Sequence, residues 1–153
     1  MLETPHVVVG AAIAAKVINP ALAIPLAFGS HFLLEMIPHW NPHLNTELSK
    51  FGKITKQSRI IITIDVVTSL AIGGFIAYRA LPNTALAVTI LFACFAAILP
   101  DLVEAPYFFC KYKNKLLLRW VAWQKSIQED AGVLLGTTTQ LLTVFAALYW
   151  IFT

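Results

Sequence analysis

Five long apolar runs dominate this chain of 153 residues, and they constrain its fold more than any other feature. The runs cover residues 6–18, 21–37, 59–79, 84–103 and 131–152. The last three have close to the ~20 residues that a helix needs to cross a bilayer, whereas the first has only about 13. Strands are disfavoured in these runs because open strands leave backbone groups unpaired in lipid. The sequence predicts an all-α, polytopic membrane bundle of about five hydrophobic helices, as a single domain over residues 1–153.

The composition supports a membrane protein and argues against a nucleic-acid-binding one. Hydrophobic residues make up 58% of the chain and charged residues only 12%, against roughly a quarter in soluble domains. The net charge of +3 does not indicate nucleic acid, because the basic residues gather between apolar runs, where anionic lipid would meet them. We therefore expect membrane lipids as partners. No basic stretch precedes the first run, so a cleavable signal peptide is not expected. Cys94 and Cys110 form neither a CxxC motif nor a disulfide framework.

The distribution of positive charge predicts the orientation in the membrane. Two segments, residues 38–59 and 104–130, contain nine of the eleven basic residues. Two predicted spans separate these segments, so both lie on the same side, which the positive-inside rule makes cytoplasmic. A short first helix does not change this result, because a full hairpin and a re-entrant hairpin both return to the starting face. We expect a cytoplasmic N-terminus, a cytoplasmic loop 38–58 and a C-terminus outside the cell.

The segment 104–130 has the pattern of an amphipathic helix. Its apolar residues recur at helical spacing and its basic residues form a separate stripe. These two stripes are Leu116, Trp120, Trp123 and Ile127, and Lys111, Lys115 and Arg119. The pattern is typical of a helix that lies in the membrane interface, and it fits equally well a linker helix packed on the inner face of the bundle. Either helix would lie over the cytoplasmic ends of the spans.

A pair of glycines in the last apolar run indicates close helix packing. Gly132 and Gly136 form a GxxxG motif, which lets helix backbones approach each other closely. The motif fits packing within one chain or a homo-oligomer formed through the two glycines.

The polar residues of the apolar runs are few, and the predicted topology places them together. A charge at the centre of a bilayer costs roughly 2.5–3.5 kcal/mol, so each such residue calls for a reason. His31 and Glu35 are one helical turn apart, and Asp101 and Glu104 are three residues apart, so each pair shares a helix face. In all, eight polar residues fall in the cytoplasmic half: His6, His31, Glu35, His39, His43, Asp65, Asp101 and Glu104. Because none of them was used to derive the topology, their convergence is an independent indication of a site.

Imidazoles and carboxylates together form a ligand set suited to Zn²⁺ or a similar divalent ion. A bound ion would neutralise carboxylates near hydrocarbon and would lower the pKa of a bound water towards 7. The predicted metal ligands are His6, His31, Glu35, His39 and Asp101. Asp65 and Glu104 are the predicted catalytic residues, with Glu104 able to complete the ligand shell and Asp65 able to act as a base.

Structural roles are the alternative for each of these residues. The histidines near the helix ends can be interfacial residues, and Asp101 after Pro100 can mark the end of a helix. Asp65 can pair with Arg59 or Lys56 towards the head groups. The His31 and Glu35 pair can form an interhelical hydrogen bond. A small membrane protein whose cluster is a polar network, serving assembly or the handling of ions or protons, is thus the alternative to an enzyme.

Three short motifs resemble a known family. The stretch Ile98–Glu104, ILPDLVE, resembles the LPD-x-D signature of the membrane-bound metal-dependent hydrolases, small bacterial and archaeal proteins that include a LexA-regulated inner-membrane group. His6 followed by a run of small residues is similar to the start of that family. The segment Ser30–Glu35 is similar to the His-x3-Asp/Glu element of zinc-dependent phospholipase C.

The resemblance implies a metal-dependent hydrolase in the inner membrane of a prokaryote. The basic amphipathic segment would draw anionic groups to the cytoplasmic face, so we expect an amphiphilic phosphoester, such as a lipid head group, as substrate. His6 and Asp101 match the family pattern directly. Glu104 stands one position later than the second aspartate of the signature, and the later His-Arg and Thr-His-Ser element of the family is absent from this chain.

Overall fold

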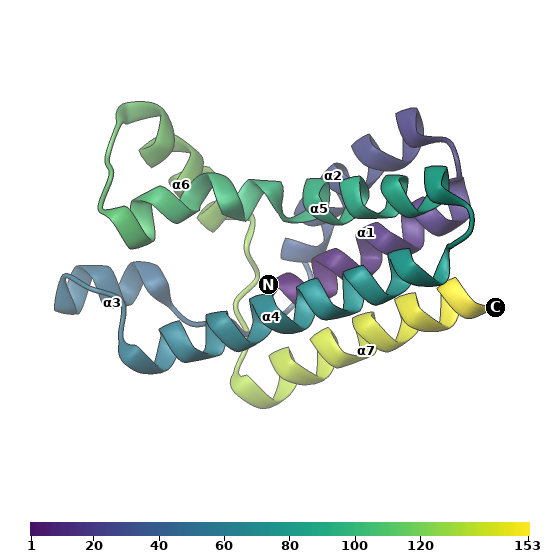
Figure 1. The fold of residues 1–153 in the computed structure, drawn as a ribbon. Coiled ribbons are helices and arrows are strands. Elements are labelled where there is room, and N and C mark those ends of the chain that lie inside the picture. Colours follow the sequence, from purple (N-terminus) through teal and green to yellow (C-terminus); the bar gives the residue numbers. More distant parts are fainter.

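The computed structural model describes all 153 residues and has seven helices and no strands, which confirms the prediction of an all-α chain. The helices, shown in Figure 1, are α1 (Glu3–Val17), α2 (Pro20–Glu35), α3 (Leu44–Phe51), α4 (Lys56–Arg79), α5 (Thr84–Cys110), α6 (Lys115–Ile127) and α7 (Val133–Phe152). Three of them, α4, α5 and α7, are long and apolar enough to cross a membrane. The helices α1 and α2 are shorter, with 15 and 16 residues.

Side-chain caps define where most of the helices begin. Asn19, Thr55, Asn83 and Asn114 each accept a hydrogen bond from a backbone N–H in the first turn of the helix that follows. Such caps satisfy N–H groups that have no partner within the helix. At the other end of α3, Gly52 has a φ of +66°, a left-handed conformation that glycine adopts at little cost.

The helix α1 lies at the centre of the bundle and packs against α2, α4, α5 and α7. Small residues allow α1 to approach these helices closely. A Cβ atom on Gly10 would lie 2.9 Å from the Ala93 carbonyl oxygen, so this glycine lets α1 pack directly on α5. The principal core is rich in alanine and includes Ala11, Ala14, Ala23, Ala27, Ala93 and Ala97.

Large apolar side chains cover much of the outer surface of α4 and α7. Ile64, Leu70, Leu134 and Phe145 are each more than half exposed. An apolar surface of this extent would be unfavourable in water and is suited to contact with lipid chains.

Three boundaries differ from those predicted. The helix α5 continues past Val103 to Cys110, because Pro100 and Pro106 are accommodated within it. A short helix, α3, lies inside the segment 38–58 that was predicted to be a loop. The amphipathic helix α6 occupies only the second half of the segment 104–130.

The helices α3 and α6 lie together at one end of the molecule, while the C-terminus lies at the opposite end (Figure 1). Leu117 and Val121 of α6 pack against Phe108 of α5 and Ile54 of the segment between α3 and α4. Leu116 and Trp123, on the predicted apolar stripe, remain exposed. The inner face of α6 is therefore packed on the bundle, and its outer face retains apolar side chains that could enter a membrane interface.

The segment that connects α6 to α7 forms a clasp on the end of α2. The backbone of Glu129 donates to the Glu35 carbonyl at 3.0 Å and accepts from the His39 N–H at 3.1 Å. Ala131 N–H donates to the His39 carbonyl at 2.8 Å. Gly136 is buried against the backbone of His39 and Trp40. One glycine of the GxxxG motif therefore packs within the chain, whereas Gly132 has nothing within 4 Å.

Candidate metal centre

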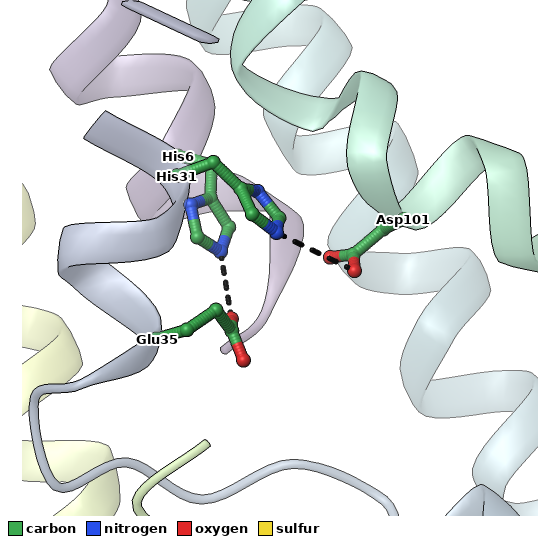
Figure 2. Close-up of side chains that lie close together, drawn as sticks. All are labelled: His6, His31, Glu35 and Asp101. Carbon is green, nitrogen blue, oxygen red and sulfur yellow. Dashed lines mark hydrogen bonds and ion pairs between the residues drawn. The ribbon is translucent and has the colours of Figure 1, made fainter. Parts of the chain in front are cut away.

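Four predicted ligands converge from three helices. His6 comes from α1, His31 and Glu35 from α2, and Asp101 from α5 (Figure 2). Each offers one donor atom, and these four atoms all lie within 4.8 Å of one another. Two donors that each lie about 2.1 Å from one ion can be at most about 4.2 Å apart, so a small inward movement of these side chains would let one divalent ion contact all four.

The ring of His31 is oriented for a ligand at Nε2. Its Nδ1 lies 2.8 Å from the Ala97 carbonyl oxygen, which can only accept, so Nδ1 donates. In the neutral ring Nε2 is then left with a free lone pair, 3.7 Å from Asp101 Oδ1. Metal-ligating histidines usually donate their second N–H to a carbonyl or carboxylate in this way.

His6 links α1 to α2. Its ring stacks on that of His31 with centroids 4.1 Å apart, and its Nε2 donates to Glu35 Oε1 at 3.1 Å. The α-amine of Met1 also contacts this carboxylate oxygen. His6, His31 and Glu35 are all buried, so the negative charge of Glu35 is balanced inside the protein rather than by water.

Two side chains of the amphipathic helix α6 support Asp101 through hydrogen bonds to α5. Gln124 Nε2 donates to Asp101 Oδ1 at 3.1 Å, and the indole N–H of Trp120 donates to the Pro100 carbonyl at 3.2 Å. Both residues therefore fix the turn of α5 that presents the carboxylate. Outer contacts of this kind set the orientation of a metal-binding side chain.

Buried polar atoms without a partner gather around this group, which is unusual because such atoms are costly in a protein interior. They are Glu3 Oε2, His6 Nδ1, His31 Nε2, Glu35 Oε2, His39 Nε2, Glu104 Oε1 and Gln124 Oε1. Three of the four converging residues contribute such an atom. His31 Nε2 and Glu35 Oε2 therefore offer free lone pairs to a bound cation, and His6 Nε2, which donates to Glu35, would join them once its proton moves to Nδ1.

His39 lies beside the group without joining it. Its Nδ1 donates to the Ile37 carbonyl at 2.8 Å, and its Nε2 is 3.6 Å from Glu35 Oε2. Burial, and then the α-amine of Met1, hold the pKa of His39 below its usual range. A neutral His39 therefore presents a free Nε2 towards Glu35, at the edge of the metal centre.

Asp65 has a structural function at the start of α1. Its carboxylate accepts from the Glu3 N–H at 2.6 Å, from the Thr4 N–H at 3.2 Å and from the Thr4 hydroxyl at 2.6 Å. A side chain of α4 thus caps α1, and the negative charge suits the positive end of the helix dipole. Asp65 does not pair with Arg59 or Lys56, so that alternative is not observed.

Glu104 and His43 lie apart from the four converging donors. Glu104 is buried one turn beyond Asp101 on α5, and it lines a cavity beside the group. His43 precedes α3, is exposed, and lies at the rim of the same cavity.

Two glutamines of this region were not identified from the sequence. Gln124 contacts Asp101, and Gln140 accepts from the Leu2 N–H at 2.9 Å while donating to the Trp40 carbonyl at 2.8 Å. The sequence nevertheless contained a feature that could have identified each glutamine. Gln140 interrupts an apolar run, and Gln124 lies on the inner face of an amphipathic helix beside Leu117 and Val121.

Comparison with protein-family models, with curated proteins and with solved structures finds no match to this chain. The functional interpretation therefore depends on the geometry of the site.

Proposed function

We propose that this protein is a membrane-embedded, metal-dependent hydrolase whose ligands are His6, His31, Glu35 and Asp101. The observation that carries the proposal is the convergence of two imidazoles and two carboxylates within 4.8 Å. Mixed nitrogen and oxygen donors of this kind favour Zn²⁺ among common divalent ions. When bound, the ion would polarise a phosphoryl oxygen and activate a water molecule for attack.

The residues around the four donors have other proposed functions: orienting the ligands, accepting a proton and holding α1 in place. The Ala97 carbonyl and Gln124 orient His31 and Asp101, so the donors are held before an ion arrives. Glu104, whose Oε1 has no partner, is the carboxylate that we propose takes a proton from the attacking water. His39, in the loop that follows α2, would complete the set of metal ligands. Asp65 would act indirectly, because its oxygens already hold α1 in place.

The proposed substrate is an amphiphile with a phosphoester in its head group. The basic residues of α3, of the first turn of α4 and of α6 are at the end of the molecule where these helices lie (Figure 1). They would attract anionic lipid groups towards that end. We propose that this end faces the cytoplasm of a prokaryotic cell, with the N-terminus inside, the C-terminus outside and the bundle in the inner membrane.

One observation favours a different function. The hydrogen bond between His6 and Glu35 links α1 to α2 without any ion. An interhelical polar network that serves assembly, or the handling of ions or protons, would use the same contact. The two functions differ in whether a divalent ion is needed.

Hydrolysis of bis(4-nitrophenyl) phosphate by the detergent-solubilised protein tests the proposal. We expect release of nitrophenolate that requires Zn²⁺ or Mn²⁺, stops with a chelator, and falls at least about a hundredfold in Asp101→Asn. The control variant Glu129→Gln, whose side chain is exposed, should keep the wild-type rate. A rate that is the same in wild type, in Asp101→Asn and in the presence of chelator would refute metal-dependent hydrolysis.

A further inference from the structure

A cavity of about 270 Å³ lies beside the metal centre, between the C-terminal half of α5 and the N-terminal half of α4. Asp101 belongs both to the four converging donors and to the wall of this cavity. The cavity is close to the lower end of the size range of small-molecule sites, about 300 Å³. It is therefore large enough for a head group but not for a whole lipid.

One wall of the cavity borders the proposed membrane. Val66 of α4 and Leu102 and Phe109 of α5 line the cavity and are 38%, 42% and 49% exposed. Both helices are long and apolar enough to cross a bilayer. A molecule that is partly embedded in the membrane could thus place its polar end in the cavity while its chains stay among the apolar side chains.

The interior of the cavity is acidic. The lining contains five carboxyl groups, those of Glu3, Asp65, Asp101, Glu104 and Asp130. Its two amines are already paired, Lys125 with Asp130 and the α-amine of Met1 with Glu35. The oxygens of Asp65 are satisfied by the start of α1. Carboxyl groups therefore outnumber amines in the wall of the cavity, so an added ammonium would find carboxyl oxygens to bind.

Two of these carboxyl groups each have one buried oxygen without a hydrogen-bond donor. Glu104 is only 8% exposed, and its Oε1 has no partner, as is also true of Oε2 of Glu3. A buried carboxylate oxygen is stabilised by an N–H donor, and most strongly by a charged one. A primary ammonium has three such donors, whereas a quaternary ammonium has none.

We propose that this cavity binds the head group of an aminophospholipid, with the primary ammonium against Glu104 and Glu3 and the phosphodiester towards Asp101. This inference names the substrate class and depends on the proposed function for the placement of the phosphodiester. A second metal ion would also satisfy the carboxylates. The apolar wall formed by Val66, Leu102 and Phe109 favours an amphiphile, because a bare ion gains nothing from such side chains.

Calorimetric titration of the full-length protein in detergent tests the binding. The titrants are dihexanoyl phospholipids with ethanolamine, choline and glycerol head groups, each below its micellar concentration and in the presence of a chelator. We expect the ethanolamine lipid to bind about tenfold more tightly than the other two, as one charge-assisted hydrogen bond would give.

Two neutral variants locate the site. Glu104→Gln should abolish the preference for ethanolamine, Glu3→Gln should weaken it, and the exposed control Glu129→Gln should leave it unchanged. Far-ultraviolet circular dichroism checks that each variant is folded. If Glu104→Gln does not fold, Glu3→Gln alone tests the inference, and an undiminished preference for ethanolamine in that variant would overturn it.

Three results would overturn the inference. These are equal binding of the three lipids, tighter binding of the glycerol lipid, and a preference that persists in Glu104→Gln. A fourth such result comes from a separate titration without chelator: two equivalents of bound Zn²⁺ in the wild type and one in Glu104→Gln would assign the carboxylate to a second metal ion. Because the lipid titration contains no free metal, its result does not depend on hydrolysis. Ethanolamine selectivity without metal-dependent hydrolysis would refute only the proposed function.

Discussion

The hydrogen bond from His31 Nδ1 to the Ala97 carbonyl determines what the opposite nitrogen of the ring can do. It keeps a proton on Nδ1 and leaves the lone pair of Nε2 directed at the space shared with Asp101. The partner is a main-chain atom, so no substitution at Ala97 would remove it directly. The orientation of this histidine is thus a property of the packing of α2 on α5.

Gln124 is the side-chain counterpart of this contact, because its amide donates to Asp101. We expect Gln124→Ala to weaken Zn²⁺ binding by about 10–100-fold, the usual cost of losing an outer contact to a ligand, while the fold is kept. Metal titration followed by the thermal midpoint would measure this. Gln57→Ala, at an exposed site on α4, is the matched control. An unchanged affinity in Gln124→Ala would show that Asp101 does not need this support.

Residue types and spacing placed the four converging donors among the five predicted ligands, but they did not predict the roles of the neighbouring residues. His31 and Glu35 share a face because they are four residues apart on one helix. Asp65 was harder to interpret, because it caps a helix that begins more than 60 positions earlier in the chain. A contact over such a distance in sequence depends on how α4 packs on α1, which no local pattern encodes.

The clasp between α6 and α7 connects two elements that are far apart in sequence. It pairs residues 129–131 with the backbone of Glu35 and His39, and the first turns of α7 then pack on the same segment. The helix α7 thereby supports the loop that carries His39. This support depends on Gly136 having no side chain.

We expect Gly136→Ala to destabilise the protein by about 1–3 kcal/mol, because the added Cβ would collide with the backbone of His39 and Trp40. Gly74→Ala on α4, where nothing lies within 4 Å, should be neutral or slightly stabilising. Thermal midpoints in the same detergent provide the comparison. Equal midpoints for the two variants would mean that the close contact of α7 with this loop is not required.

Hydropathy predicted the existence of the apolar helices better than it predicted their ends. Asp101 and Glu104 made α5 look finished at Val103, yet the helix continues because both carboxylates face the site and the cavity rather than lipid. The helix α3 was missed because its eight residues carry no apolar run. Charge alone therefore did not distinguish the end of a helix from a functional face.

At the scale of the whole molecule, helix topology brings the donors together. His6 is near the start of α1, His31 and Glu35 are near the end of α2, and Asp101 is in the second half of α5. Helices that alternate in direction place these positions at one level of the bundle, which is why the predicted topology anticipated their convergence. The distances between donor atoms depend on side-chain packing and could not be predicted in this way.

The central claim is that these donors bind a divalent ion, and the thermal midpoint of the chelator-treated protein titrated with Zn²⁺ tests it most directly. An ion that binds only the folded state stabilises it by about 2.7 kcal/mol at 100 times its Kd. We expect the midpoint of the wild type to fall on chelation and to recover with Zn²⁺. His31→Ala should abolish the response, and the exposed His43→Ala should retain it. The contradictory result is a wild-type midpoint that ignores both chelator and Zn²⁺, with His31→Ala still less stable by about 1–2 kcal/mol from a lost interhelical hydrogen bond.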